Sequence, residues 1–345
     1  MTAKTGIPAT SREIRLKRYP TGLPSKADFE LAEVPLPAPA EGQMLVRNIV
    51  MSVDPYMRGR MTGARDSYIP PFDLGAALTG EAVGQVMLSK DGAYPVGAYV
   101  TSMLGWRETF VAGGDQLKPV DAKAAPLSAY LGVLGMPGLT AYGGFLRYGQ
   151  PKPGQTVFVS GAAGAVGSVV CQVAKIKGCR VIGSAGGPEK ARWLTEVAGI
   201  DHAIDYKAVP DLVAELKRLC PDGIDVYFEN VGGKHLEAAL ENMKVHGRIV
   251  MCGMIAGYNE RTPGPPNLMR IVRRRLTVQG ILFMDLQDMG PAFENDMARW
   301  IAEGRMKWHE TVFEGIEQAP EAFLGLFSGA NLGKMVVRLG PDRVG

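Results

Sequence analysis

A glycine-rich turn between a strand and a helix is the feature that most constrains the fold of this 345-residue chain. The turn reads Ser160-Gly-Ala-Ala-Gly-Ala-Val-Gly167, after a β-rich run at Thr156–Ser160 and before helical spacing over Ala165–Lys177. Small side chains let a backbone approach a pyrophosphate, and a helix N-terminus offers N–H groups and partial positive charge. The run departs from G-x-G-x-x-G by one glycine, and an ordinary small-residue turn is the alternative. Its place between strand and helix favours a dinucleotide site.

The same alternation of strand and helix continues along the chain after this turn. Continuous apolar strands between amphipathic helices indicate a parallel sheet covered on both faces, so we predict a doubly wound α/β fold of the Rossmann type. Leu276–Phe283 could extend this sheet, and Lys334–Leu339 is a further strand that could return to the first domain. The predicted strand and helix pairs are Arg180–Ser184 with Glu189–Val197, His202–Asp205 with Pro210–Leu219, and Ile224–Phe228 with Lys234–Met243, followed by a strand at Arg248–Cys252.

The first 130 residues have a different pattern. Short β-branched runs are punctuated by proline and glycine, with little helical periodicity, which predicts a compact, barrel-like β domain. The predicted strands are Met44–Val53, Glu81–Leu88, Ala98–Leu104 and Glu108–Val111.

The end of the second strand of the repeat indicates which dinucleotide binds. An NAD site usually has an acid there for the ribose hydroxyls, but the segment Gly183–Lys190 has no acid until Glu189, in the next helix. Lys190 can give a positive charge to a 2′-phosphate, and Gly186 leaves room for that phosphate. A solvated helix lysine is the alternative for Lys190. The missing acid and the nearby base together favour NADP(H).

Composition excludes several other classes of protein. The 38 basic and 35 acidic residues nearly balance, which argues against a nucleic-acid binder or a polybasic membrane anchor. The basic run Arg270, Arg273, Arg274 and Arg275 is therefore expected to be a solvated connection. We find no apolar run long enough to span a membrane and no signal peptide, and the four cysteines form no C-x-x-C. Reduced thiols and a cytoplasmic location are expected.

Five phrases in order identify a resemblance to one family. They are Val53-Asp-Pro-Tyr-Met-Arg58, Met136-Pro-Gly-Leu-Thr-Ala-Tyr142, Ala162–Gly167, Glu229-Asn-Val-Gly-Gly233 and Asn331-Leu-Gly-Lys334. Together they resemble the zinc-free medium-chain dehydrogenase/reductases, in the branch of prostaglandin, 2-alkenal and curcumin reductases. The resemblance runs nearly end to end.

The resemblance implies two domains and an activity. A GroES-like β-barrel catalytic domain would comprise residues 1–133, completed by residues 306–345, and a Rossmann dinucleotide-binding domain would comprise residues 134–305. The implied reaction is NADPH-dependent reduction of the C=C bond of α,β-unsaturated ketones and aldehydes, with hydride transfer to the β-carbon. Because relatives are commonly dimeric and Leu276–Phe283 would be a bare sheet edge, we expect a homodimer.

The resemblance also implies site residues, carried over position by position. Tyr258 would be the catalytic hydrogen-bond donor to the enolate, with a packing aromatic as the alternative, and Tyr56 would lie at the substrate end unless it only forms a turn. Lys190 and Tyr206 would meet the 2′-phosphate. The complete cofactor set is Ala163, Gly164, Ala165, Val166, Gly167, Gly186, Lys190, Tyr206, Asn230, Cys252, Gly253, Met254, Ile255, Ala256, Gly257, Tyr258, Ile281, Leu282, Phe283 and Asn331.

The residues do not favour a catalytic zinc. Zinc-dependent relatives carry a cysteine and a Gly-His-Glu phrase where this chain has Ser52-Val-Asp54 and Gly80-Glu-Ala82. His202, His235, His246 and His309 lack the spacing of a metal site. Without a metal, a hydrogen-bond donor must stabilise the enolate, and a phenol is protonated at neutral pH.

Two other functions remain open at this stage. A quinone oxidoreductase of the same superfamily is disfavoured by the Met136–Tyr142 and Val53–Arg58 phrases. A noncatalytic NADPH-binding or RNA-binding protein is disfavoured by the intact cofactor residues and Tyr258. Oxidation of NADPH with and without a simple enone separates the catalytic from the noncatalytic possibility.

Overall fold

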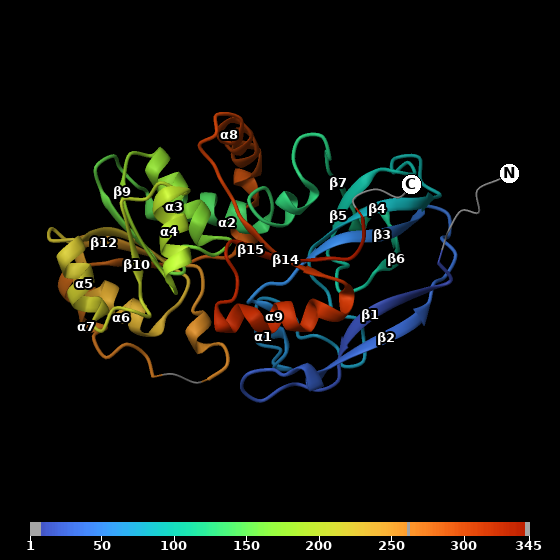
Figure 1. Ribbon diagram of the computed structural model, residues 1–345, viewed down its shortest axis with the longest axis horizontal. Helices are drawn as coiled ribbons and strands as arrows, with labels where there is room; N and C mark the ends of the chain where they lie inside the picture. Colours follow the sequence, from blue (N-terminus) through green and yellow to red (C-terminus); the bar gives the residue numbers. More distant parts are fainter. Residues whose placement is uncertain (1–7, 261–262, 342–345) are drawn as a thin grey trace. The chain divides into compact units, whose positions relative to one another are not determined.

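The computed structural model describes residues 8–260 and 263–341, which form two compact units (Figure 1). Unit 1 contains the described residues up to Leu131, Thr311–Ala330, and the residues from Met335 on. Unit 2 contains Gly132–Glu310 and Asn331–Lys334.

Unit 2 is built on a parallel sheet, as the sequence predicts. Among the described residues this sheet has six strands in the order β10-β9-β8-β11-β12-β13. Strand β8, which comes first in the sequence of unit 2, is therefore central, and the later strands add to the sheet on both sides of it. This is the Rossmann strand order. The strands are β8 (Thr156–Val159), β9 (Arg180–Ala185), β10 (His202–Asp205), β11 (Ile224–Glu229), β12 (Met243–Met251) and β13 (Thr277–Gly280).

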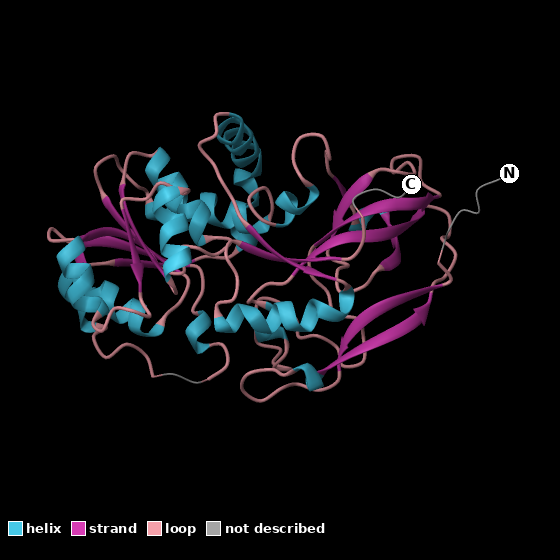
Figure 2. Ribbon diagram, viewed as in Figure 1, coloured by secondary structure: helices cyan, strands magenta, loops and turns pink. Residues whose placement is uncertain are grey.

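Helices cover both faces of this sheet (Figure 2). One face packs against α5 and α6 through a buried apolar cluster that includes Phe158, Tyr227 and Leu240. Phe158 and Tyr227 stack with their ring centroids 5.0 Å apart. Helices α3 and α4 lie on the opposite face of the sheet (Figure 1). The helices of unit 2 are α2 (Met136–Gly144), α3 (Gly167–Ile176), α4 (Pro188–Glu196), α5 (Leu212–Leu219), α6 (Gly233–Asn242), α7 (Met269–Arg274) and α8 (Gly290–Ala302).

Several predicted elements of unit 2 differ from the observed ones. Strand β12 begins at Met243 rather than Arg248. Helix α3 begins at Gly167 rather than Ala165, because the preceding residues form the turn. The strand predicted at Leu276–Phe283 is limited to Thr277–Gly280 and is followed by a 3₁₀-helix, η6 (Phe283–Met289). The basic run, expected to be a solvated connection, lies in helix α7 and at its C-terminal end. Arg273 and Arg275 are exposed, whereas Arg274 donates to main-chain oxygens of Glu241 and Met243.

Unit 1 is a mostly antiparallel β structure, again as the sequence predicts. Its larger sheet has the order β14-β15-β3-β4-β5-β7, with β6 also pairing with β3. The C-terminal strand β15 pairs with β3, which confirms that the tail returns to the first domain. The strands are β1 (Thr10–Leu16), β2 (Phe29–Pro35), β3 (Gln43–Ser52), β4 (Ala82–Ser89), β5 (Tyr99–Ser102), β6 (Thr109–Gly113), β7 (Lys118–Pro119), β14 (Glu310–Glu314) and β15 (Lys334–Arg338), and the helices are α1 (Met57–Arg60) and α9 (Ala319–Ser328).

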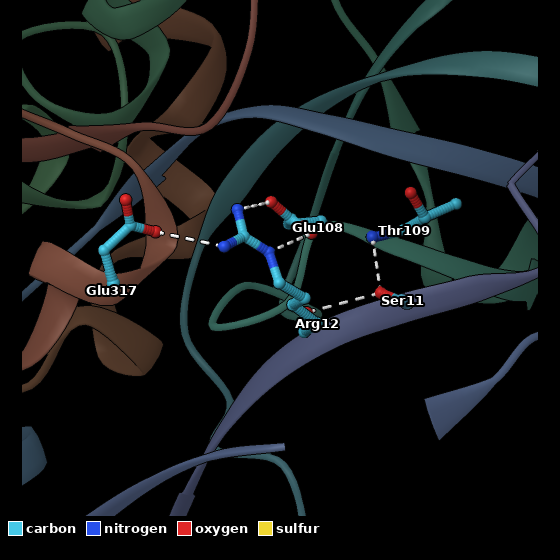
Figure 3. Close-up of polar contacts among 5 residues, drawn as sticks. All are labelled: Ser11, Arg12, Glu108, Thr109 and Glu317. Carbon is cyan, nitrogen blue, oxygen red and sulfur yellow. Dashed lines mark hydrogen bonds and ion pairs between the residues drawn. The ribbon is translucent and has the colours of Figure 1, made fainter. Parts of the chain in front are cut away.

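The β1–β2 hairpin is tied to the rest of unit 1 by polar contacts (Figure 3). Arg12 donates to both carboxylate oxygens of Glu108, at 2.6 and 3.0 Å, and also reaches Glu317 at 3.4 Å. On the same strand, Ser11 Oγ accepts the Thr109 amide at 2.9 Å. These bonds connect β1 with the start of β6 and with the segment before α9. They orient the β1–β2 hairpin more than they stabilise it, since partly exposed ion pairs contribute little to the free energy of folding.

Over the described ranges, none of the helices has the length and apolar character needed to cross a membrane.

Candidate cofactor site at the carboxyl edge of the parallel sheet

The glycine-rich turn lies between the carboxyl end of β8 and the N-terminus of α3, where a parallel sheet binds its ligands. The Ala162 amide donates to Ser184 O at 2.9 Å, which joins the turn to the end of β9. A Cβ on residue 167 would lie 2.3 Å from Gly161 O, so only glycine fits where the helix begins. The backbone therefore turns tightly into α3, whose N-terminus carries a partial positive charge.

A distant segment of unit 2 lies against this turn. The Gly333 amide donates to Ala163 O at 2.8 Å, and residues 164 and 333 form a parallel bridge. Asn331 is held beside it by a 2.9 Å bond from its side-chain amide to Gly333 O. The structure therefore brings the predicted residue Asn331 next to the turn.

A positively charged corner forms beyond the end of β9. A Cβ on residue 186 would lie 2.9 Å from both Tyr206 Oη and Lys207 Cε, so glycine allows these two side chains to lie over the backbone. Lys190 is half-buried nearby, and its pKa is lowered by burial and then by the charge of Lys207. Lys207 is exposed, but its charge and the burial of Lys190 both disfavour the ammonium form of Lys190, and an anion bound beside Lys190 would offset both effects.

Polar groups beneath this corner hold it in place. Asp205 accepts the amides of Gly187 and Lys207, at 2.8 and 3.1 Å. The ring of Tyr206 meets the edge of the His235 ring, with centroids 5.0 Å apart. His235 is buried and its Nε2 lies 2.8 Å from Ser184 Oγ, and burial lowers the pKa of His235 to about 4. The imidazole is therefore neutral at physiological pH.

The loops after β11 and β12 are hydrogen-bonded to each other. The Ile255 amide donates to Asn230 O at 3.2 Å, and the Ala256 amide donates to Val231 O at 3.0 Å. Asn230 is also bound to the end of β8, because its side-chain amide donates to Ser160 O at 2.7 Å. The predicted residue Asn230 and the predicted stretch 252–258 thus belong to one connected group of loops.

Tyr258 follows the short 3₁₀-helix η5 (Ile255–Gly257) in this group. Its side chain is partly buried, and its hydroxyl turns back toward the start of the loop, 3.1 Å from where a Cβ on Gly253 would be. Neighbouring Met254 lies over Gly232 with about half of its surface exposed. The phenol therefore lies at the carboxyl edge of the sheet, near the ends of β11 and β12.

The remaining predicted cofactor residues, Ile281–Phe283 and Cys252, differ in how far they are buried. The Ile281 amide donates to Met251 O at 3.1 Å, but its side chain is buried and packs against Gly144 of α2. Leu282 and Phe283 follow it and are partly exposed. Burial raises the pKa of the Cys252 thiol to about 12, with the charge of Glu229 adding to the effect. This thiol is therefore protonated and has little nucleophilic character.

Tyr56 belongs to unit 1, just before α1. Its hydroxyl is buried and makes no hydrogen bond within the part of the chain that the structure describes. Burial, followed by the charges of Asp54 and Glu81, raises the pKa of Tyr56 well above its ordinary value. The group is a protonated donor that a ligand could satisfy.

Within residues 8–260 and 263–341, no three His, Cys, Asp or Glu side chains converge in a way that could hold a metal ion.

Sequence reasoning overlooked several side chains that shape this edge. Ser184, Glu229 and His235 are buried polar residues that the predicted site does not include. A signal was present for two of them, because Ser184 and Glu229 stand where an apolar strand ends. His235 lies within a helix, and only the packing of α6 on the sheet brings it to Ser184.

Comparison with known proteins covers nearly the whole chain. Residues 12–120 match the family described as the N-terminal domain of oxidoreductase, and residues 165–303 match the family described as zinc-binding dehydrogenase. The chain is 45% identical to the NADP⁺-dependent 2-alkenal reductase of Nicotiana tabacum, covering 95% of this chain and 97% of that protein. It is 42% identical to the NADPH-dependent curcumin reductase of Escherichia coli (strain K12), covering 95% of this chain and 96% of that protein. The crystal structure of CurA from Vibrio vulnificus in complex with NADPH superposes with a TM-score of 0.91 at 40% identity, covering 96% of this chain and 99% of CurA.

The depressed pKa of His235 predicts a specific dependence of stability on pH. Above pH 6.5, the ordinary pKa of histidine, the His235 imidazole is neutral in both the folded and the unfolded protein. Between about pH 6.5 and pH 4, the unfolded chain binds a proton at His235 and the folded protein does not. Stability is therefore lost as the pH falls through this window, by ~2–3 kcal/mol from this residue. We expect His235→Gln to remove that part of the loss in urea unfolding measured at pH 7 and pH 4.5.

The matched control is His202→Gln, because His202 is exposed on β10. This control should keep the wild-type dependence on pH. Equal pH dependence in wild type and His235→Gln would contradict the assignment of a buried, neutral imidazole.

Proposed function

Because the chain belongs to the zinc-free branch of the medium-chain dehydrogenase/reductases, we propose that it is an NADPH-dependent reductase of α,β-unsaturated ketones and aldehydes. The observation that carries this proposal is the gathering of three features at one edge of the sheet. They are the glycine-rich turn, the positive corner beside Lys190, and the Tyr258 phenol.

The cofactor residues divide by the part of NADPH they would bind. Residues 163–166 would hold the pyrophosphate against the N-terminus of α3, and Gly167 would let that helix pack closely on the sheet. Lys190 and Tyr206, with Gly186 leaving space, would hold the 2′-phosphate, and the repulsion between Lys190 and Lys207 supports an anion there. Asn230, residues 252–258, Ile281–Phe283 and Asn331 would complete the cleft.

Tyr258 would act on the charge that develops during the reaction. When bound, NADPH supplies the hydride for the β-carbon of the substrate. Negative charge then moves to the carbonyl oxygen, and the Tyr258 hydroxyl would donate a hydrogen bond to it. Proton uptake at the α-carbon completes the reduction. Since a phenol remains protonated at neutral pH, the donor needs no metal ion.

The chain would divide into two functional domains. We assign residues 1–133, completed by residues 306–345, as the catalytic domain and residues 134–305 as the dinucleotide-binding domain. The buried hydroxyl of Tyr56, which lacks a partner within the described residues, would bind a polar atom of the substrate. The protein would work in the cytoplasm on small molecules.

The direct test follows NADPH absorbance with and without a simple enone, such as cyclohexenone. Oxidation that requires the enone, with a saturated ketone as product, supports the proposal. Binding of NADPH without enone-dependent oxidation would instead identify a noncatalytic binder.

The first prediction concerns the choice of cofactor. Lys190→Ala should raise the Kd for NADPH roughly 10- to 100-fold, the usual range for one charged hydrogen bond, and should leave NADH binding nearly unchanged. Fluorescence titration measures both constants. The control is Lys217→Ala, an exposed lysine on α5. Equal losses for NADPH and NADH would refute the role of Lys190.

The second prediction concerns the enolate. Tyr258→Phe keeps the ring and removes the donor, so we expect kcat to fall by roughly 10- to 100-fold while the Kd for NADPH changes little. Single-turnover kinetics with a fixed enone would establish that the chemical step is measured. Unchanged kcat would remove Tyr258 from the mechanism, and a large rise in Kd would make it a cofactor contact instead.

The third prediction concerns assembly. Strand β13 ends the parallel sheet and is exposed along its length, and Val272 of α7 nearby is 68% exposed. We propose a homodimer through this edge. Light scattering at micromolar concentration should give the mass of a dimer, and Val278→Asp should shift it to monomer. The control Val96→Asp alters an exposed valine of unit 1 and should remain dimeric, and a monomeric wild type would refute the proposal.

A further inference from the structure

A buried carboxylate lies under the loops of the candidate cofactor site. Glu229 ends strand β11, and its side chain is 0% exposed. Its Oε1 accepts the Ser160 hydroxyl at 2.6 Å and the Val231 amide at 2.6 Å. Burying a carboxylate is costly unless donors surround it, so these two short bonds compensate much of that cost.

The bonds of Glu229 connect three loops that come from separate strands. The Ser160 hydroxyl, which donates to Glu229, also accepts the Asn230 amide at 2.8 Å. The backbone oxygen of Glu229 accepts the amides of Cys252 and Gly253, at 2.9 and 3.1 Å. One residue therefore joins the loop after β8 to the loops after β11 and β12.

The other half of the carboxylate has a different environment. Glu229 Oε2 and Tyr227 Oη are both buried, and neither makes a hydrogen bond within the described residues. Tyr227 lies two residues earlier on the same face of β11, and the charge of Glu229, after burial, raises its pKa. Ser160 also affects the pKa of Tyr227, so the Tyr227 hydroxyl lies close to both Glu229 and Ser160. The hydrogen bonds from the Glu229 carboxylate to the loops run through its Oε1.

We propose that Glu229 is a positioning residue, which holds Asn230 and the loop bearing Tyr258 in the arrangement that binds the nicotinamide half of NADPH. This inference rests on the proposed function. The Glu229 side chain lies beneath the loops and acts through Ser160 and Val231. The backbone oxygens of Asn230 and Val231 in turn accept the amides of Ile255 and Ala256, in the loop that bears Tyr258. The contribution of Glu229 comes from hydrogen-bond acceptance at fixed points, which a neutral acceptor of the same shape can supply.

The test compares NADPH binding among three variants, at a temperature where circular dichroism shows each variant folded. Glu229→Ala removes the acceptor and leaves the donors of Ser160 and Val231 unsatisfied, so we expect the Kd for NADPH to rise at least tenfold. Glu229→Gln keeps an acceptor oxygen and should stay within threefold of wild type. Tyr142→Phe is the control, because it removes a buried hydroxyl that donates to Asp296 of α8, outside these loops, and its Kd should equal that of wild type.

Ser160→Ala provides an independent test if Glu229→Ala fails to fold. It removes the hydroxyl that connects Glu229 with Asn230, and its Kd should rise three- to tenfold. Because the two residues act through one network, the double variant should bind NADPH about as weakly as Glu229→Ala alone.

Each outcome separates this inference from the proposed function. If wild type binds NADPH and both Ser160→Ala and folded Glu229→Ala bind within twofold of it, Glu229 is a structural residue only, and the proposed function stands. If Glu229→Gln loses as much affinity as Glu229→Ala, the charge acts rather than the acceptor, and the positioning role is wrong. A wild type that binds no NADPH overturns the proposed function and this inference with it.

Discussion

The parallel pairing of β8 with β9 and β11 places the ends of several strands at one edge of the sheet. These strands are buried on both faces, so their apolar residues are committed to the core, and polar residues begin only where the strands end. Ser160, Ser184 and Glu229 occupy those ends and are themselves buried. Every feature of the candidate site, from the glycine-rich turn to the Tyr258 loop, depends on this arrangement.

Burial also determines the charge of several side chains at the carboxyl edge of the sheet. It favours the neutral form of His235 and of the Cys252 thiol, so His235 is uncharged and Cys252 is protonated. In unit 1, the Tyr56 phenol is held protonated for the same reason. Lys190 and Lys207 add positive charge at this edge, beside the acidic side chains of Glu189 and Asp205. Such an edge suits an anionic cofactor, and neutral donors suit a carbonyl oxygen that gains charge.

The pattern of apolar and polar residues along the chain predicted some helices and strands better than others. Strands β8 to β11 and the helices between them follow clear apolar periodicity, and their ends were predicted within a few residues. Helix α2 has buried residues around nearly its whole circumference, so it lacks the one-sided pattern that reveals a surface helix. The basic run was expected to be a solvated connection because the charges of the whole chain nearly balance. Helix α7 is also stabilised by bonds from Arg274 to the end of α6 and the start of β12, which no local pattern contains.

The sequence by itself determined the parallel sheet, the turn between Ser160 and Gly167, and the absence of an acid between Gly183 and Pro188. Each of these follows from residues close together in the chain, whose periodicity, size and charge act locally. Only the tertiary structure decided that Ser160 meets Glu229, 69 positions away, and that Tyr206 packs on His235. Hydrogen bonds between loops depend on strand order and register, and these are set by the packing of the whole sheet rather than by any segment of it.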